Sequence, residues 1–255
     1  MLRETSVVGE LGRYAVRSVG DRRRRRVTYV PPTSGLGEPV LLVPGFMAGD
    51  STLNAMSRSL RRAGFRTYRS QIRSNVRCTV DASVELEARL EAIAIRRGSR
   101  VHVVGHSLGG MLARGLAVRR PDLVASIVTL GSPMLAPGAH HVLLTKSVEM
   151  LVRLSRAGVP GLMSADCVSG DCARAGFDES RRPIPSEVGF TAIYSRRDGI
   201  VDWRACVDPE AHAIEVRASH SGMAVDPRVI DVVLGAIRWQ ARAGSVLEVD
   251  RGESA

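Results

Sequence analysis

The residues best suited to chemistry form the segment Gly105-His106-Ser107-Leu108-Gly109-Gly110, which contains the pattern Gly-x-Ser-x-Gly. The valine-rich residues 100–104 predict a short buried strand before it, and residues 111–120 predict a helix that stops before Pro121. A serine on a tight strand-to-helix turn projects its hydroxyl above the sheet, and flanking glycines remove side chains that would collide there. We therefore predict that Ser107 is a nucleophile. The alternative is a glycine-rich packing turn.

A serine hydroxyl needs a general base, which is expected after the last strand of the sheet. The chain has six histidines, and only His220 lies between the last predicted strand and the last predicted helix. The others lie in the strand, in the turn, before a strand or in a long insertion: His102, His106, His212, His140 and His141. We predict that His220 is the base, with a purely structural histidine as the alternative.

A carboxylate beside the base would fix its tautomer and stabilise the imidazolium formed during the reaction. Asp198 follows a predicted strand directly and precedes a glycine that permits a sharp turn. Asp202 lies four residues further on and is the second candidate. Asp198 is the predicted acid.

Acyl chemistry also needs an oxyanion hole, which is usually built from two backbone N–H groups. The N–H of Leu108, directly after the serine, is the first predicted donor. The second is expected in the glycine-rich loop at residues 44–50, from Phe46 or, as the alternative, from Met47. This loop lacks the lysine of a phosphate-binding loop, so a nucleotide site is not indicated.

The elements that must position these residues alternate between strand and helix. The expected strands are 39–44, 65–70, 100–104, 126–130, 190–195 and 213–217, and the expected helices are 51–63, 81–97, 111–120, 141–157 and 227–242. Asp226 is the expected N-cap of the last helix, and Gly244 lies just past its expected end. Apolar strands in such an alternation predict an α/β fold with a mainly parallel sheet and helices on both faces.

Three parts of the chain are distinguished. Residues 1–38 form an N-terminal extension, and residues 39–133 together with 189–255 form the α/β core. Residues 134–188 are too long for a simple crossover and carry an apolar helical face at 141–157. We predict that this insertion is a helical cap or lid over the site, with an ordinary core-packing helix as the alternative.

Together these features resemble the α/β-hydrolase superfamily and, within it, the bacterial lipase/esterase branch. The resemblance covers roughly residues 39–243 and rests on Pro44-Gly45-Phe46, the turn at 105–110, Asp198-Gly199-Ile200-Val201 and His220-Ser221-Gly222-Met223. It implies a two-step mechanism in which Ser107 attacks an acyl carbonyl, His220 relays the proton and water releases the acyl group. Pro44 departs from this pattern, because lipases commonly carry histidine there.

The implied activity is hydrolysis of carboxylic esters with lipid-like or medium-chain acyl groups. An acyltransferase or a thioesterase would use the same three residues, and a non-catalytic binding protein of the same fold would be expected to lack one of them. No organic cofactor and no catalytic metal are expected. The expected partner is therefore a small-molecule acyl ester or lipid, and the oligomeric state is left open.

The composition bounds the remaining partners. The chain has 255 residues, a length that fits one large α/β domain, and a formal net charge of +10. Its aromatic content of 4% argues against a stacking platform for nucleic acid. The densest basic run, Arg22 to Arg26, is interpreted as a solvated segment, with contact to a membrane surface or an acidic partner as the alternative.

The four cysteines leave their pairing open. Cys167 and Cys172 bracket a short polar turn and are expected either to form a local bridge or to be free thiols. No histidine lies near them at zinc-finger spacing, so no structural metal is predicted. No apolar run has the length of a transmembrane span or a secretory signal, and a cytoplasmic protein is the expectation.

Overall fold

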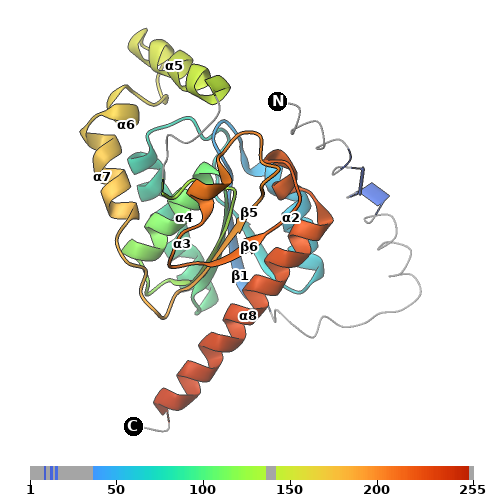
Figure 1. The fold of residues 1–255 in the computed structure, drawn as a ribbon. Helices are drawn as coiled ribbons and strands as arrows, with labels where there is room; N and C mark the ends of the chain where they lie inside the picture. Colours follow the sequence, from blue (N-terminus) through green and yellow to red (C-terminus); the bar gives the residue numbers. More distant parts are fainter. Residues whose placement is uncertain (1–8, 10–11, 14, 17–36, 136–141, 253–255) are drawn as a thin grey trace.

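The computed structural model describes residues 9, 12–13, 15–16, 37–135 and 142–252 (Figure 1). Its core is one six-stranded sheet of parallel strands in the order β2-β1-β3-β4-β5-β6. The strands are β1 (Pro39–Val43), β2 (Arg66–Arg69), β3 (Val101–His106), β4 (Val124–Leu130), β5 (Gly189–Tyr194) and β6 (His212–Glu215). The predicted α/β fold with a mainly parallel sheet is confirmed.

Helices cover both faces of this sheet (Figure 1). They are η2 (Asp50–Leu53), α2 (Asn54–Arg62), α3 (Thr79–Arg97), α4 (Leu108–Arg119), α5 (Val142–Arg156), α6 (Asp166–Ser169), α7 (Asp171–Ser180), η3 (Trp203–Cys206), η4 (Ser221–Ala224) and α8 (Pro227–Gly252). Along β1, Val40 and Leu42 pack with α2 and α8, whereas Leu41 and Val43 pack with α3 and α4. Because both faces are buried, the strand is apolar at every position rather than at alternate ones.

The sheet order changes direction between β1 and β3, since β2 lies on one side of β1 and the later strands on the other. Ligands of open parallel sheets bind beyond the carboxyl ends of the strands at such a switch point. The turn at Ser107 follows β3 and the glycine-rich loop follows β1. Both therefore lie beside this position.

The insertion at residues 134–188 contains α5, α6 and α7, between β4 and β5. The predicted helix at 141–157 is confirmed as α5, and α7 packs on α3 and α4 (Figure 1). The insertion's role as a cap stays a prediction. His140 and His141 lie outside the described residues.

The last helix differs from the prediction. Asp226 is its N-cap as expected, because Oδ1 of Asp226 accepts a hydrogen bond from the Arg228 N–H at 2.9 Å. However, α8 continues through Gly244 to Gly252 and does not end near residue 242. One glycine costs a helix only about 1 kcal/mol relative to alanine, which need not end it.

Candidate active site

Ser107 lies on a strained turn between β3 and α4. Its φ of 52° and ψ of −123° fall in a region that residues other than glycine rarely adopt. The Ser107 N–H donates to the Leu130 carbonyl at 2.8 Å, which ties the turn to the neighbouring strand β4. A Cβ at Gly105 or Gly109 would collide with backbone atoms of the turn or of β1, so both positions need glycine.

His220 and Asp198 are hydrogen-bonded to each other, with 2.6 Å between His220 Nδ1 and Asp198 Oδ2. Both side chains are almost fully buried. The other carboxylate oxygen of Asp198 accepts from the N–H groups of Ile200 and Val201, each at 2.8 Å. Because a carboxylate only accepts, Nδ1 of His220 is the donor in this hydrogen bond.

The turn at Ser107 and the loop at His220 meet through His106. Its ring lies 4.8 Å from the His220 ring, and its Nε2 donates to the His220 carbonyl oxygen at 2.9 Å. Burial, followed by repulsion from His220, lowers the pKa of His106 to about 3, so this ring is neutral. Sequence reasoning placed His106 in the turn but assigned it no role. No local pattern reveals a partner 114 positions away.

The other histidines of the described chain have different roles. His102 lies in β3 and shares a 2.7 Å hydrogen bond with the hydroxyl of Ser126. Burial lowers the pKa of His102 to about 4, and the nearby Arg100 lowers it further. His212 begins β6 at the surface, where its ring lies 5.8 Å from that of Trp239. Both agree with the expectation that His220 is the base.

Asp202 has a separate partner. Its Oδ1 accepts from the Arg204 N–H at 3.0 Å and so caps η3, and its side chain is 47% exposed. Of the two candidate acids, Asp198 is the one in contact with His220.

The loop after β1 lies directly against Ser107, because a Cβ at Gly45 would approach the Ser107 Cβ to 3.0 Å. Asn75, which is 2% exposed, holds this loop. Its side-chain amide donates to the Pro44 carbonyl and its backbone N–H to the Ala48 carbonyl, both at 2.9 Å. Sequence reasoning missed Asn75, since it lies in a segment without a motif.

The same contacts bear on the second oxyanion donor. The Met47 N–H donates to the Asn75 carbonyl at 3.0 Å, so it is not free to face an oxyanion in this conformation. This removes Met47 from the two candidates and favours Phe46. Leu108 is the first residue of α4, where the helix dipole also favours negative charge.

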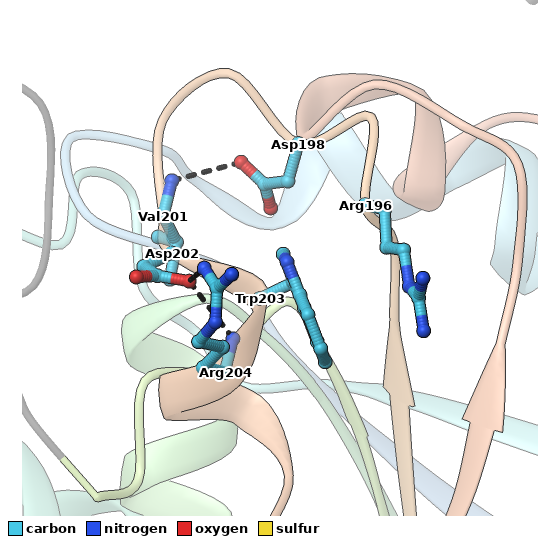
Figure 2. Close-up of a pocket in the computed structure, with 6 residues that line it drawn as sticks. All are labelled: Arg196, Asp198, Val201, Asp202, Trp203 and Arg204. Atoms are coloured by element: carbon cyan, nitrogen blue, oxygen red, sulfur yellow. Dashed lines mark hydrogen bonds and ion pairs between the residues drawn. The ribbon is translucent and has the colours of Figure 1, made fainter.

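A cavity of about 480 Å³ lies beside Asp198 and is lined by Arg196, Asp198, Val201, Asp202, Trp203 and Arg204 (Figure 2). Trp203 stands between two guanidinium groups, those of Arg196 and Arg204, at 4.8 and 4.9 Å from its ring centre. Neither Ser107 nor His220 lines this cavity. We therefore do not assign it to an acyl chain.

Comparison with known proteins agrees with this geometry. The sequence model of the α/β-hydrolase fold family matches residues 81–155, which include the Ser107 turn. A triacylglycerol lipase of Vibrio cholerae serotype O1 is 33% identical over 98 residues. That match spans 36% of this chain and 31% of the relative's length.

Solved structures resemble a larger part of the chain. The mature lipase BlEst2 of Bacillus licheniformis has a TM-score of 0.64 at 15% identity, over 83% of this chain and 96% of its own. A monoacylglycerol lipase of Paleococcus ferrophilus has a TM-score of 0.52 at 14% identity, over 80% and 97%. A thioesterase domain of the curacin pathway has a TM-score of 0.50 at 15% identity, over 81% and 92%. At these identities the likeness shows the α/β-hydrolase fold.

Proposed function

We propose that this chain, which has the α/β-hydrolase fold and is similar to bacterial lipases and esterases, cleaves carboxylic esters through an acyl-enzyme on Ser107. The observation that carries the proposal is the 2.6 Å hydrogen bond between His220 and Asp198 on loops that meet the Ser107 turn. A buried imidazole that a carboxylate orients is the group that an unreactive serine hydroxyl requires as its base.

In the first step, Nε2 of His220 takes the Ser107 proton as the oxygen attacks the acyl carbonyl. The resulting imidazolium is stabilised by Asp198, which stays ionised. The N–H groups of Leu108 and Phe46 receive the oxyanion, and His220 then protonates the leaving alcohol. Water repeats the sequence and releases the acid.

We infer that the substrates carry lipid-like acyl groups, because the loop after β1 and the insertion expose large apolar side chains. Met47, beside the proposed oxyanion donor, is 54% exposed, and Leu135, just before the undescribed part of the insertion, is 43% exposed. The insertion exposes further large apolar side chains: Met150 (54%), Leu154 (41%) and Val159 (44%). Large apolar side chains exposed on a surface are typical of surfaces that meet lipid or another protein. Contact with a lipid surface is part of this proposal. No helix of the described chain is long and apolar enough to cross a membrane.

Labelling with a serine-reactive fluorophosphonate tests the nucleophile. The native chain should be labelled at Ser107, and Ser107→Ala should not be labelled. Ser132→Ala is a matched control, because Ser132 is also buried but donates to a backbone carbonyl. Equal labelling of the native chain and Ser107→Ala would refute the assignment.

A substrate series tests the reaction. We expect p-nitrophenyl esters to be turned over with a burst equal to the enzyme concentration, with kcat/KM rising from acetyl to octanoyl. A matched series of acyl-coenzyme A thioesters should be slower. Faster turnover of the thioesters would replace the ester reading with the thioesterase one, while leaving Ser107 as the nucleophile.

A further inference from the structure

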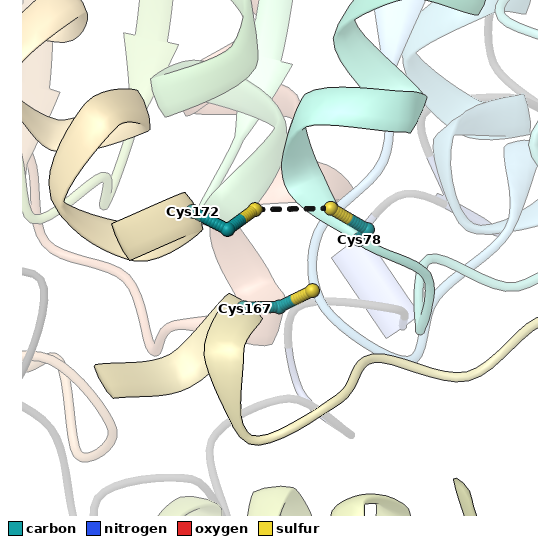
Figure 3. Close-up of side chains that lie close together, drawn as sticks. All are labelled: Cys78, Cys167 and Cys172. Carbon is teal, nitrogen blue, oxygen red and sulfur yellow. Dashed lines mark hydrogen bonds between the residues drawn. The ribbon is translucent and has the colours of Figure 1, made fainter. Parts of the chain in front are cut away.

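Three cysteines from separate segments meet at the junction between the insertion and the core (Figure 3). Cys78 is the N-cap of α3, Cys167 lies in α6 and Cys172 lies in the first turn of α7. Their sulfur atoms all lie within 4.8 Å of one another, and the shortest separation is 3.3 Å between Cys78 and Cys172. All three are free thiols and partly exposed.

We propose that Cys78 and Cys172 form a disulfide bond that fastens the 134–188 insertion to α3. Figure 3 shows the sulfurs of these two residues facing each other, with Cys167 to one side. The local Cys167–Cys172 bridge considered from the sequence is disfavoured, because the Cys172 sulfur lies 3.3 Å from that of Cys78, whereas the Cys167 sulfur lies 3.4 Å from the Ser164 hydroxyl. The pairing crosses 94 positions, which spacing along the chain does not indicate.

A metal ion is the other chemistry that three thiols suggest. Structural zinc sites almost always have four protein ligands. Within the part of the chain that the structure describes, no histidine, carboxylate or fourth cysteine joins this group. The disulfide needs only the pair that is already closest.

The bond forms by exchange with an external disulfide, here oxidised glutathione. The thiolate of Cys78 attacks one glutathione sulfur and releases a glutathione thiolate. The Cys172 sulfur, as its thiolate, then attacks the Cys78 sulfur of this mixed disulfide and releases the second glutathione thiolate. Two cysteines are oxidised, one glutathione disulfide is reduced to two thiols, and the cysteine protons pass to the released thiolates.

The position of the bond connects it to the proposed active site. The insertion is also held by a 2.8 Å hydrogen bond from the Met163 N–H to the Val76 carbonyl. Val76 lies between Cys78 and Asn75, the residue that holds the loop beside Ser107. The disulfide would therefore hold the segment 75–78 at Cys78, the end opposite to Asn75.

Peptide mapping tests the proposal on the full chain after incubation with oxidised glutathione and alkylation of the remaining thiols. Trypsin with an Asp-specific protease separates the cysteines into residues 78–80, 166–170 and 171–174. We expect 78–80 linked to 171–174, with Cys167 alkylated. The melting temperature should rise by several degrees relative to the dithiothreitol-treated protein.

Three variants complete the design. Cys172→Ser should abolish both the link and the redox-dependent shift in melting temperature, whereas Cys167→Ser should keep both. Cys206→Ser is the matched control, since Cys206 is buried apart from the cluster and burial raises the pKa of its thiol. A 166–170 to 171–174 link, three alkylated thiols, or one zinc ion bound with all three thiols protected would each overturn the proposal.

Discussion

The side chain of His106 donates a hydrogen bond to the backbone carbonyl of His220, with 2.9 Å between the two atoms. The residue before the proposed nucleophile thus holds the backbone of the proposed base. A neutral imidazole suits this task, because a charged one would repel the imidazolium that His220 would become in the proposed reaction. The buried position of His106 lowers its pKa to about 3 and so keeps it neutral.

Replacing His106 should therefore impair catalysis more than folding. His106→Leu removes the donor to His220, and we expect kcat for a p-nitrophenyl ester to fall about 10- to 100-fold, the size of about 1–3 kcal/mol from one lost buried hydrogen bond. KM should change little. His106→Gln keeps an N–H at a similar reach and should recover part of kcat. Equal losses in the two variants would contradict the positioning role.

Two buried histidines should make the protein acid-sensitive. The folded pKa values of His102 and His106, about 4 and about 3, both lie below the ordinary 6.5. Between the lowered pKa of each histidine and 6.5, the unfolded chain binds more protons than the native state does. The contribution of each histidine to stability is therefore present at pH 7 and is lost as the pH falls below about 6.5. Each histidine should cost about 2 kcal/mol of unfolding free energy between pH 7 and pH 5.

Urea unfolding at the two pH values measures this loss. His102→Gln cannot titrate, so it should show about half of the native chain's pH dependence. If His102→Gln keeps the full pH dependence of the native chain, then titration of His102 does not contribute to the loss of unfolding free energy.

Asn75 should act on catalysis through the loop that it holds. Asn75→Leu removes the donor to the Pro44 carbonyl and leaves that carbonyl unpaired. We expect a 10- to 100-fold lower kcat, about 1–3 kcal/mol, because the second oxyanion donor loses its fixed position. The chain's other asparagine provides the control: Asn54 accepts only a 3.3 Å bond from Arg69 at the surface, and Asn54→Ala should retain full activity.

Replacing each of the two candidate acids should change kcat by very different amounts. Asp198→Asn removes the carboxylate that orients His220, and we expect kcat to fall by about 10⁴-fold. Asp202→Asn should keep nearly full activity, because its carboxylate only caps η3. The same ester assay compares the two, and a reversed order would transfer the acid role to Asp202.

The buried ion pair between Arg114 and Asp208 should matter for stability. Arg114 Nε donates to Asp208 Oδ2 at 2.9 Å, and both side chains are at most 5% exposed. Asp208→Ala leaves Glu210, at 2.7 Å, as the remaining carboxylate partner of the guanidinium and should cost about 1.5–3 kcal/mol of unfolding free energy. Asp171→Ala, which breaks the exposed pair with Arg174, should cost less than about 1 kcal/mol in the same chemical denaturation.

Much of this protein could be read from local patterns. Glycines at 105 and 109 between an apolar strand and a helix indicated Ser107, because close backbone approach excludes other residues there. The strand-helix alternation predicted the parallel sheet, whose geometry brings strand ends together and so made Asp198 and His220 the candidates. The end of α8 was wrong, since helix propensity is only a weak local preference.

What the tertiary structure alone decided are the contacts between distant segments. Such contacts include the one between His220 and Asp198 rather than Asp202, and the hydrogen bonds by which Asn75 holds Met47 and the loop after β1. All of them depend on which groups face each other across loops. The approach of Cys78 to Cys172 is of the same kind. Periodicity reports which side of an element is buried, but it carries no information about which atom of another element meets that side.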